Sequence, residues 1–155
     1  MDKKINKKVQ LLFFDTYLAV IKNSIDSHLF RNLYAKVNGK KIDITKNGEL
    51  SCAFYVSSIL LLFRFIKEGH ATVDSTVKDL KQFGWKEIKK PKMGSIIVWE
   101  KKDFGKSSAH KHIGFFIGNN KAVSNSDKLG YPALHRITFE VNRKVELILW
   151  NSKLK

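Results

Sequence analysis

Cys52 is the only cysteine in the 155 residues, and its position suits a nucleophile. It comes after the turn signal Asn47-Gly48 and directly follows Ser51, a residue type that commonly caps a helix. The residues from there to Phe63 are mostly apolar at helical spacing, which predicts a helix buried on nearly all sides. In the first turn of such a helix, unpaired N–H groups and the positive end of the macrodipole favour a thiolate. The alternative interpretation of a lone cysteine is an inert buried side chain.

A thiol nucleophile needs a base, and a histidine at the start of a later strand is the candidate. His112 precedes the apolar segment Ile113–Ile117, which is typical of a buried strand. His110 lies two residues earlier and would face the same side of that strand. The two histidines could instead form half of a metal site, but no acidic residue or cysteine stands at a familiar metal spacing from them. We therefore predict His112 as the base, no metal and no cofactor, with His110 at the edge of the substrate site.

Helices in the first half of the chain and a sheet in the second half must position these residues. Apolar spacing predicts helices over about 5–25, 51–67 and 72–83. Asn38-Gly39 predicts a small hairpin between residues 34–37 and 40–44. Strands are predicted over residues 95–100, 112–117, 122–125, 136–141 and 145–150, with Asn142-Arg143 as the turn between the last two. The expected fold class is therefore α+β, with an antiparallel sheet of about five strands.

The chain is strongly basic, with 29 Lys and Arg against 14 Asp and Glu and a net charge of +15. Such a surface attracts nucleic acid, anionic cell-wall polymers or acidic membrane surfaces. It is equally consistent with a device for solubility, because no aromatic-interleaved RNA-binding motif accompanies the charge. The single cysteine excludes an internal disulfide and any zinc site built from several cysteines.

No apolar stretch reaches the roughly 18 residues that a membrane span requires, so we expect a soluble chain. The lysine-rich N-terminus superficially resembles the start of a signal peptide, but Gln10, Asp15 and Thr16 interrupt the apolar run that follows. The location therefore stays open between the cytoplasm and release to the cell wall by another route. We expect a monomer.

The order of these motifs resembles the NlpC/P60 branch of the papain-like cysteine peptidases, with the CHAP amidases as close relatives. The resemblance rests on the helix that opens with Cys52, the strand start within Lys90–Trp99, and His112–Asn119 with its Gly-Asn turn. It covers about residues 49–139. The resemblance implies one papain-like domain over 1–155, with 1–30 as an N-terminal helical extension and 49–150 as the catalytic core.

Two positions depart from the family pattern. The family commonly has Asp before the nucleophile and Ser-Gly after it, whereas Cys52 follows Ser51 and precedes Ala53-Phe54. The family's Gly-Asp at the first strand is Gly94-Ser95 here. These differences bear on substrate preference more than on the fold.

A third residue should orient the histidine, and in the resembling family it lies on the strand after the base, at about Ser124. Serine is a weak orienter, whereas Asn125 can hold an imidazole through its amide oxygen, as in Cys-His-Asn sites. Pleat alternation turns Asn125 away from the side of Ser124 unless the strand bulges or ends there. We favour Asn125 and keep Ser124 and His135 as alternatives. Trp99, a core anchor of the sheet, is also the candidate wall of the substrate cleft.

The resemblance implies acyl-transfer chemistry. His112 would draw the thiol proton to give a thiolate–imidazolium pair, and Cys52 would attack an amide carbonyl whose oxygen binds its backbone N–H. The expected activity is hydrolysis of an amide or isopeptide bond in a peptide, and the resemblance points to peptidoglycan stem peptides. Two alternatives stay open: an acyltransferase on the same site, and an inactive basic module that binds nucleic acid or an anionic wall polymer.

Overall fold

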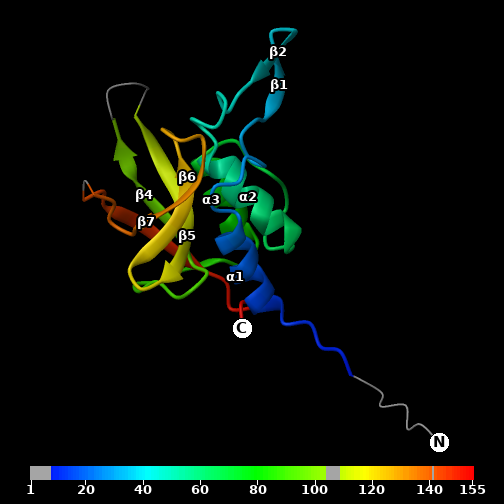
Figure 1. Ribbon diagram of the computed structural model, residues 1–155, viewed down its shortest axis with the longest axis vertical. Coiled ribbons are helices and arrows are strands. Elements are labelled where there is room, and N and C mark those ends of the chain that lie inside the picture. Colours follow the sequence, from blue (N-terminus) through cyan, green and yellow to red (C-terminus); the bar gives the residue numbers. More distant parts are fainter. Residues whose placement is uncertain (1–7, 104–108, 141) are drawn as a thin grey trace, which may run out of the picture.

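Helices and sheet occupy opposite sides of the molecule, as seen in the computed structural model, which describes residues 8–103, 109–140 and 142–155 (Figure 1). Within these residues three helices, α1 (Phe13–Asn23), α2 (Cys52–Leu62) and α3 (Val73–Gln82), accompany a six-stranded and a two-stranded antiparallel sheet. The predicted α+β class is therefore confirmed. None of the helices in the described ranges combines the length and the apolar character needed to cross a bilayer.

The main sheet has the strand order β3-β8-β4-β5-β6-β7, and every neighbouring pair is antiparallel. Its strands are β3 (Lys86–Glu87), β4 (Ile96–Lys102), β5 (His110–Gly118), β6 (Lys121–Ser126), β7 (Tyr131–Arg136) and β8 (Val145–Trp150). Helix α2, which begins with Cys52, packs against β5 and β6 near the middle of the sheet. The chain therefore brings the start of α2 to the strand that carries His112.

The predicted strand over 136–141 is wrong in its described part, where residues 137–140 form a turn, and residue 141 lies outside the described residues. The hairpin turn assigned to Asn142-Arg143 is also wrong. The strand in this region is β7, which ends at Arg136, and β7 and β8 lie in different parts of the sheet. The segment contains Ile137 and Phe139, which alternate with polar residues as in a strand. Both side chains instead enter a small core from a turn segment.

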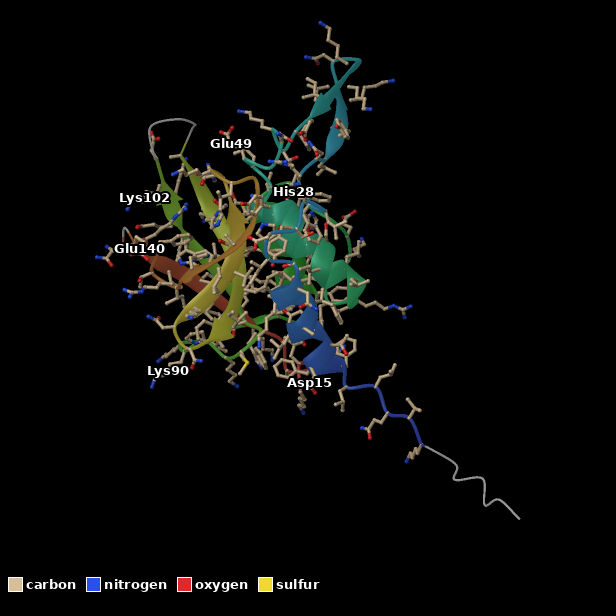
Figure 2. All side chains as sticks on the ribbon, viewed as in Figure 1. Asp15, His28, Glu49, Lys90, Lys102 and Glu140 are labelled. Carbon is tan, nitrogen blue, oxygen red and sulfur yellow. The ribbon has the colours of Figure 1, made fainter. Side chains whose placement is uncertain are left out.

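The predicted hairpin is confirmed as β1 (Tyr34–Val37) and β2 (Lys40–Asp43), a sheet of its own that projects from the rest of the molecule (Figure 1). Asn38 and Gly39 both have positive φ, as the tight turn of a two-residue hairpin requires. Glu49 lies near the base of this hairpin, on the path toward α2 (Figure 2).

The helix boundaries differ from the predictions at two ends. Helix α1 begins at Phe13 rather than near residue 5, and Val9 and Leu12 before it are exposed; residues 1–7 lie outside the described part. Helix α2 ends at Leu62 instead of continuing to residue 67. Helix α3 begins as predicted, with the Thr72 side chain accepting a hydrogen bond from the Ser75 N–H.

Two apolar cores lie on the two faces of the sheet. The larger, between sheet and helices, contains Tyr17 of α1, Tyr55 of α2 and Ile113 of β5; the smaller contains Trp99 and Ile137. Successive strand residues point to opposite faces. Ile113 therefore faces the helices, whereas the side chain of His112 lies with the smaller core.

Candidate active site

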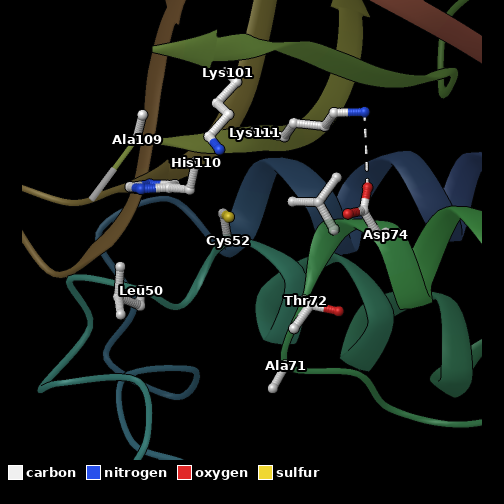
Figure 3. Close-up of a pocket in the computed structure, with 10 residues that line it drawn as sticks. Leu50, Cys52, Ala71, Thr72, Asp74, Lys101, Ala109, His110 and Lys111 are labelled. Carbon is white, nitrogen blue, oxygen red and sulfur yellow. Dashed lines mark ion pairs between the residues drawn. The ribbon is translucent and has the colours of Figure 1, made fainter. Parts of the chain in front are cut away.

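Cys52 is the first residue of α2, and its side chain is buried but borders a groove. The backbone N–H groups of Ile113 and Ala53 lie close enough to its sulfur to lower the pKa of the thiol. The groove, of about 460 Å³, runs from Leu50 past the start of α3 to His110 at the start of β5 (Figure 3). Cys52 therefore lies at a helix start, as predicted, and beside a groove.

The expectation of a thiolate at this helix start is not met. Burial raises the pKa of the Cys52 thiol to about 11, and the N–H groups of Ile113 and Ala53 and the charge of Arg143 only partly oppose it. Ser51 stands at the N-cap position, but its hydroxyl donates to the Phe30 carbonyl and makes no helix cap. Desolvation thus raises the pKa of the thiol by more than the N–H groups at the helix start lower it. Cys52 is therefore a neutral thiol at neutral pH.

His112 belongs to a chain of hydrogen bonds on β5, β6 and β7. Its Nε2 lies 2.8 Å from the Ser124 hydroxyl, which lies 2.7 Å from Nε2 of His135. Nδ1 of His135 lies 2.7 Å from the Arg136 carbonyl oxygen. Burial lowers the pKa of both histidines, and for His112 the charges of Arg143, His135 and His110 lower it further, so both rings are neutral at neutral pH.

This chain of partners determines the tautomers, because a carbonyl oxygen can only accept. His135 must carry its proton on Nδ1, which makes its Nε2 an acceptor for the Ser124 hydroxyl. The Ser124 oxygen then accepts from His112, whose proton lies on Nε2. Nδ1 of His112 is left with a lone pair, which is the state that a general base needs.

Close packing holds these rings in place. Trp99 lies beneath both, with its ring centroid 5.6 Å from that of His112 and 5.5 Å from that of His135. Its Nε1 donates to the Ile137 carbonyl at 2.6 Å, and its side chain is fully buried. Trp99 therefore supports the histidines from the core and is not the cleft wall that we expected.

Gly114 permits Ser124 to lie directly across from it in the neighbouring strand. A Cβ at Gly114 would stand only 2.6 Å from the Ser124 Cβ. A side chain at this position would therefore push β6 away and separate Ser124 from His112.

Within the described residues no hydrogen bond joins the Cys52 sulfur to the His112 ring. The backbone N–H of Ile113, the residue that follows His112, is close enough to the sulfur to lower the pKa of the thiol. Catalytic hydrogen bonds are commonly long before substrate binds and tighten in the complex. Proton transfer between the two requires a shift of the ring or of the sulfur.

Asn125, the favoured third residue, does not hold the imidazole. Its Nδ2 donates to the Gly48 carbonyl at 2.6 Å, and its buried Oδ1 has no hydrogen-bond partner in the described part of the chain. The strand continues through Ser126 without a bulge at this point, so alternation turns Asn125 away from the side of Ser124. Ser124 makes the expected bond, and His135 extends it.

The loop that precedes Cys52 contacts β6 and the start of β7. Gly48 has φ +93°, and a Cβ there would lie 2.2 Å from the Gly130 oxygen. Arg31 Nε donates to the Asn47 carbonyl at 3.2 Å. With the Asn125 bond, these contacts fix the path of the chain into Cys52.

Arg143 is a member of the site that the sequence analysis assigned only to a turn. Its guanidinium is buried, and it donates to the Glu100 carbonyl at 3.0 Å and the His110 carbonyl at 2.8 Å. These bonds connect the ends of β4 and β5 where their register shifts. Nothing distinguished this residue in the sequence from the other basic residues, because its position depends on contacts distant along the chain.

His110 lies where we expected a residue at the edge of the site. It lines the groove that contains Cys52, and it also lines a second hollow, of about 310 Å³, that contains His112, Ser124 and Arg143. Among the described residues, no three His, Cys, Asp or Glu side chains are grouped so that they could hold a metal ion. His110 therefore lines both the groove that contains Cys52 and the hollow that contains His112.

Comparison of the chain with known proteins adds no relative. No protein-family model matches the sequence, and no curated protein matches it. The resemblance to NlpC/P60 enzymes therefore stays an expectation from the sequence motifs.

Proposed function

We propose that the protein is a thiol hydrolase that cleaves an amide bond in a peptide, with Cys52 as nucleophile and His112 as general base. The observation that carries the proposal is the hydrogen-bond chain through Ser124, which leaves a lone pair on Nδ1 of His112. The backbone N–H of the next residue of the same strand, Ile113, favours the anionic form of the sulfur, and the thiol borders a groove. A buried hydroxyl between two histidines is not needed for packing alone, because apolar side chains would fill the same space.

The reaction begins from a neutral thiol and a neutral imidazole. Nδ1 of His112 takes the thiol proton as the sulfur of Cys52 attacks the carbonyl carbon, and the carbonyl oxygen becomes an oxyanion. The backbone N–H of Cys52 at the helix start is positioned to donate to this oxygen. The positive charge of Arg143 favours the anionic sulfur, as its effect on the Cys52 pKa indicates.

The second half of the reaction returns the site to its first state. The carbon–nitrogen bond breaks, the imidazolium gives its proton to the leaving amine, and a thioester with Cys52 remains. Water then attacks the thioester while His112 accepts a proton from it. The carbon–sulfur bond breaks, the proton passes to the sulfur, and the free acid leaves.

The substrate class proposed is a peptidoglycan stem peptide or a similar peptide, supported by the resemblance of residues 49–139 to the NlpC/P60 enzymes. The groove beside Cys52 is of a size that holds a few residues of an extended chain. Lys101 and Lys111 line it, and Lys111 is paired with Asp74 at 3.7 Å and Glu146 at 3.4 Å.

The test is to incubate the full chain with digested wall fragments and to identify products by mass spectrometry. Wild type should release a peptide with a new amine and a new carboxylate, and Cys52→Ala and His112→Ala should not. An added primary amine should leave the products unchanged; capture of the acyl group by the amine would instead indicate an acyltransferase. Wild type that converts no fragment, although thermal melts show that it is folded, would overturn the proposal.

A further inference from the structure

The β1–β2 hairpin is a prominent feature that the proposed reaction does not use. It forms a separate two-stranded sheet, and its side chains spread into solvent at one end of the molecule (Figures 1 and 2). Two-stranded hairpins are at best marginally stable in water by themselves. A hairpin that projects from the rest of the molecule is therefore a candidate surface for binding a partner.

The charges on one face of the hairpin break a rule of strand pairing. Lys36 lies directly opposite Lys41, so their side chains share one face, and like charges at such positions destabilise a sheet. Neither ammonium forms an ion pair in the described residues. Tyr34 lies on the same face, with the Lys41 Nζ 4.5 Å from its ring centroid. The exposed Lys40 lies across from Val37, on the other face of the hairpin, and adds a positive charge beside the turn.

The nearest acidic side chain on the hairpin does not neutralise these lysines. The Asp43 carboxylate accepts hydrogen bonds from the Asn32 side chain, the Thr45 hydroxyl and the backbone N–H groups of Leu33, Thr45 and Asn47. It is thus fully engaged at the root of the hairpin. Lys36 and Lys41 therefore have no acidic partner among the described residues, and the Tyr34 ring is the contact that the Lys41 ammonium makes.

The root of the hairpin leads directly to the nucleophile. Asp43 ties residues 32–47 together, and the following loop is held by the bond from Asn125 to the Gly48 carbonyl. Four residues after Gly48, the chain enters helix α2 at Cys52. The root of the hairpin is therefore held by the same loop that leads the chain into Cys52.

We propose that the Tyr34, Lys36 and Lys41 face of the hairpin, with Lys40, docks onto an anionic wall polymer made of phosphodiester-linked polyols. The inference rests on the proposed function for the choice of a wall polymer. The opposed lysines can bracket one phosphate, and Tyr34 offers a flat surface for the polyol units between phosphates. Tyr34 is the only aromatic residue of the hairpin, whereas proteins that bind single-stranded nucleic acid stack successive bases on several.

The test measures binding of the full chain carrying Cys52→Ala to poly(glycerol phosphate), at two salt concentrations. A triple Lys→Gln variant at Lys36, Lys40 and Lys41 is compared with a control triple Lys→Gln variant at Lys78, Lys121 and Lys153. Both variants lose the same charge, and all six lysines are exposed. We expect at least tenfold weaker binding for the hairpin variant, and a salt dependence reduced by about two to three counterions. The control should lose less than about threefold.

Equal losses in both variants would overturn the proposal, as would no binding by the parent protein. Tighter binding to single-stranded DNA or to anionic lipid vesicles at equal phosphate concentration would also overturn it and assign the hairpin to that partner. Thermal melts separate loss of binding from loss of fold, because removal of the opposed Lys36 and Lys41 charges should leave the melting temperature unchanged or higher. The outcome is independent of hydrolysis, since every protein in the test lacks the thiol.

Discussion

The Ser124 hydroxyl lies 2.8 Å from Nε2 of His112 and thereby fixes which ring nitrogen carries the proton. Because the same hydroxyl donates to His135, Nδ1 of His112 keeps its lone pair. A serine alone is a weak orienter of histidine. Here His135 donates from Nδ1 to the Arg136 carbonyl, so its Nε2 accepts the proton of the Ser124 hydroxyl. The hydroxyl therefore points toward His135 and its oxygen accepts from His112.

Removal of the Ser124 hydroxyl should slow catalysis without weakening substrate binding. In Ser124→Ala the Nε2–H of His112 loses its acceptor, and the ring is free to adopt the other tautomer. We expect kcat on a wall peptide to fall about 10- to 100-fold with KM nearly unchanged.

Ser24→Ala is the matched control for this measurement. The Ser24 hydroxyl is also buried and bonds the Tyr55 hydroxyl at 2.7 Å, and it takes no part in the hydrogen-bond chain of His112. Both variants should lose about 1–3 kcal/mol of stability, because each leaves a buried partner unsatisfied. Equal kcat for Ser124→Ala and Ser24→Ala would remove Ser124 from the mechanism.

The tautomers can be observed directly. Imidazole ¹⁵N spectra at neutral pH should show His112 protonated on Nε2 and His135 protonated on Nδ1, because the Arg136 carbonyl can only accept. In Ser124→Ala the His112 signals should shift toward a mixture of tautomers. A wild-type His112 protonated on Nδ1 would contradict the base role.

The Cys52 thiol should react with iodoacetamide far more slowly near neutral pH than an activated cysteine. Its pKa of about 11 arises from burial, and only the thiolate is nucleophilic. The alkylation rate should therefore rise about tenfold per pH unit from about pH 7 to 10. Because the chain has one cysteine, Cys52→Ser supplies the blank. A rate that is already constant near pH 7 would instead indicate a preformed thiolate–imidazolium pair.

Stability should fall as the pH drops below about 6.5. Burial lowers the pKa of His112 and His135 in the folded protein, so below the ordinary histidine pKa the unfolded chain binds more protons. Their contribution is present above about pH 6.5 and is lost on acidification. Urea unfolding at pH 7.5, 6 and 5 measures it, and His135→Gln should show a shallower decline. Parallel declines for the two proteins would show that His135 does not contribute.

Gly48→Ala should disrupt the loop that leads to the nucleophile. Gly48 and Gly39 both have positive φ, but a Cβ at Gly39 meets no atom within 4 Å, whereas one at Gly48 meets the Gly130 backbone. Both alanine variants lose about 1–2 kcal/mol from the left-handed backbone. Gly48→Ala should lose at least about 2 kcal/mol more from the overlap. Equal urea midpoints for the two variants would show that the loop relaxes freely.

Local patterns were sufficient to predict the elements that carry the chemistry. The apolar run after Cys52, the apolar segment after His112 and the Asn38-Gly39 turn each correspond to an element of the structure. Helical periodicity and turn geometry depend on residues close together in the chain, so they can be recognised without the fold. The segment 136–141 misled us because a turn that fills a small core can show the same alternation as a strand.

The sequence by itself determined that Cys52 opens a buried helix and that His112 lies on a buried strand. Only the tertiary structure decided that Ser124 rather than Asn125 bonds His112, because the partner depends on the register of β6 against β5. Only the fold revealed that Trp99 is fully buried and that burial raises the pKa of Cys52. The burial of a side chain and the register of a strand depend on contacts between segments that are distant in the chain. Desolvation by those contacts changes the pKa of Cys52 by more than the local effect of a helix start does.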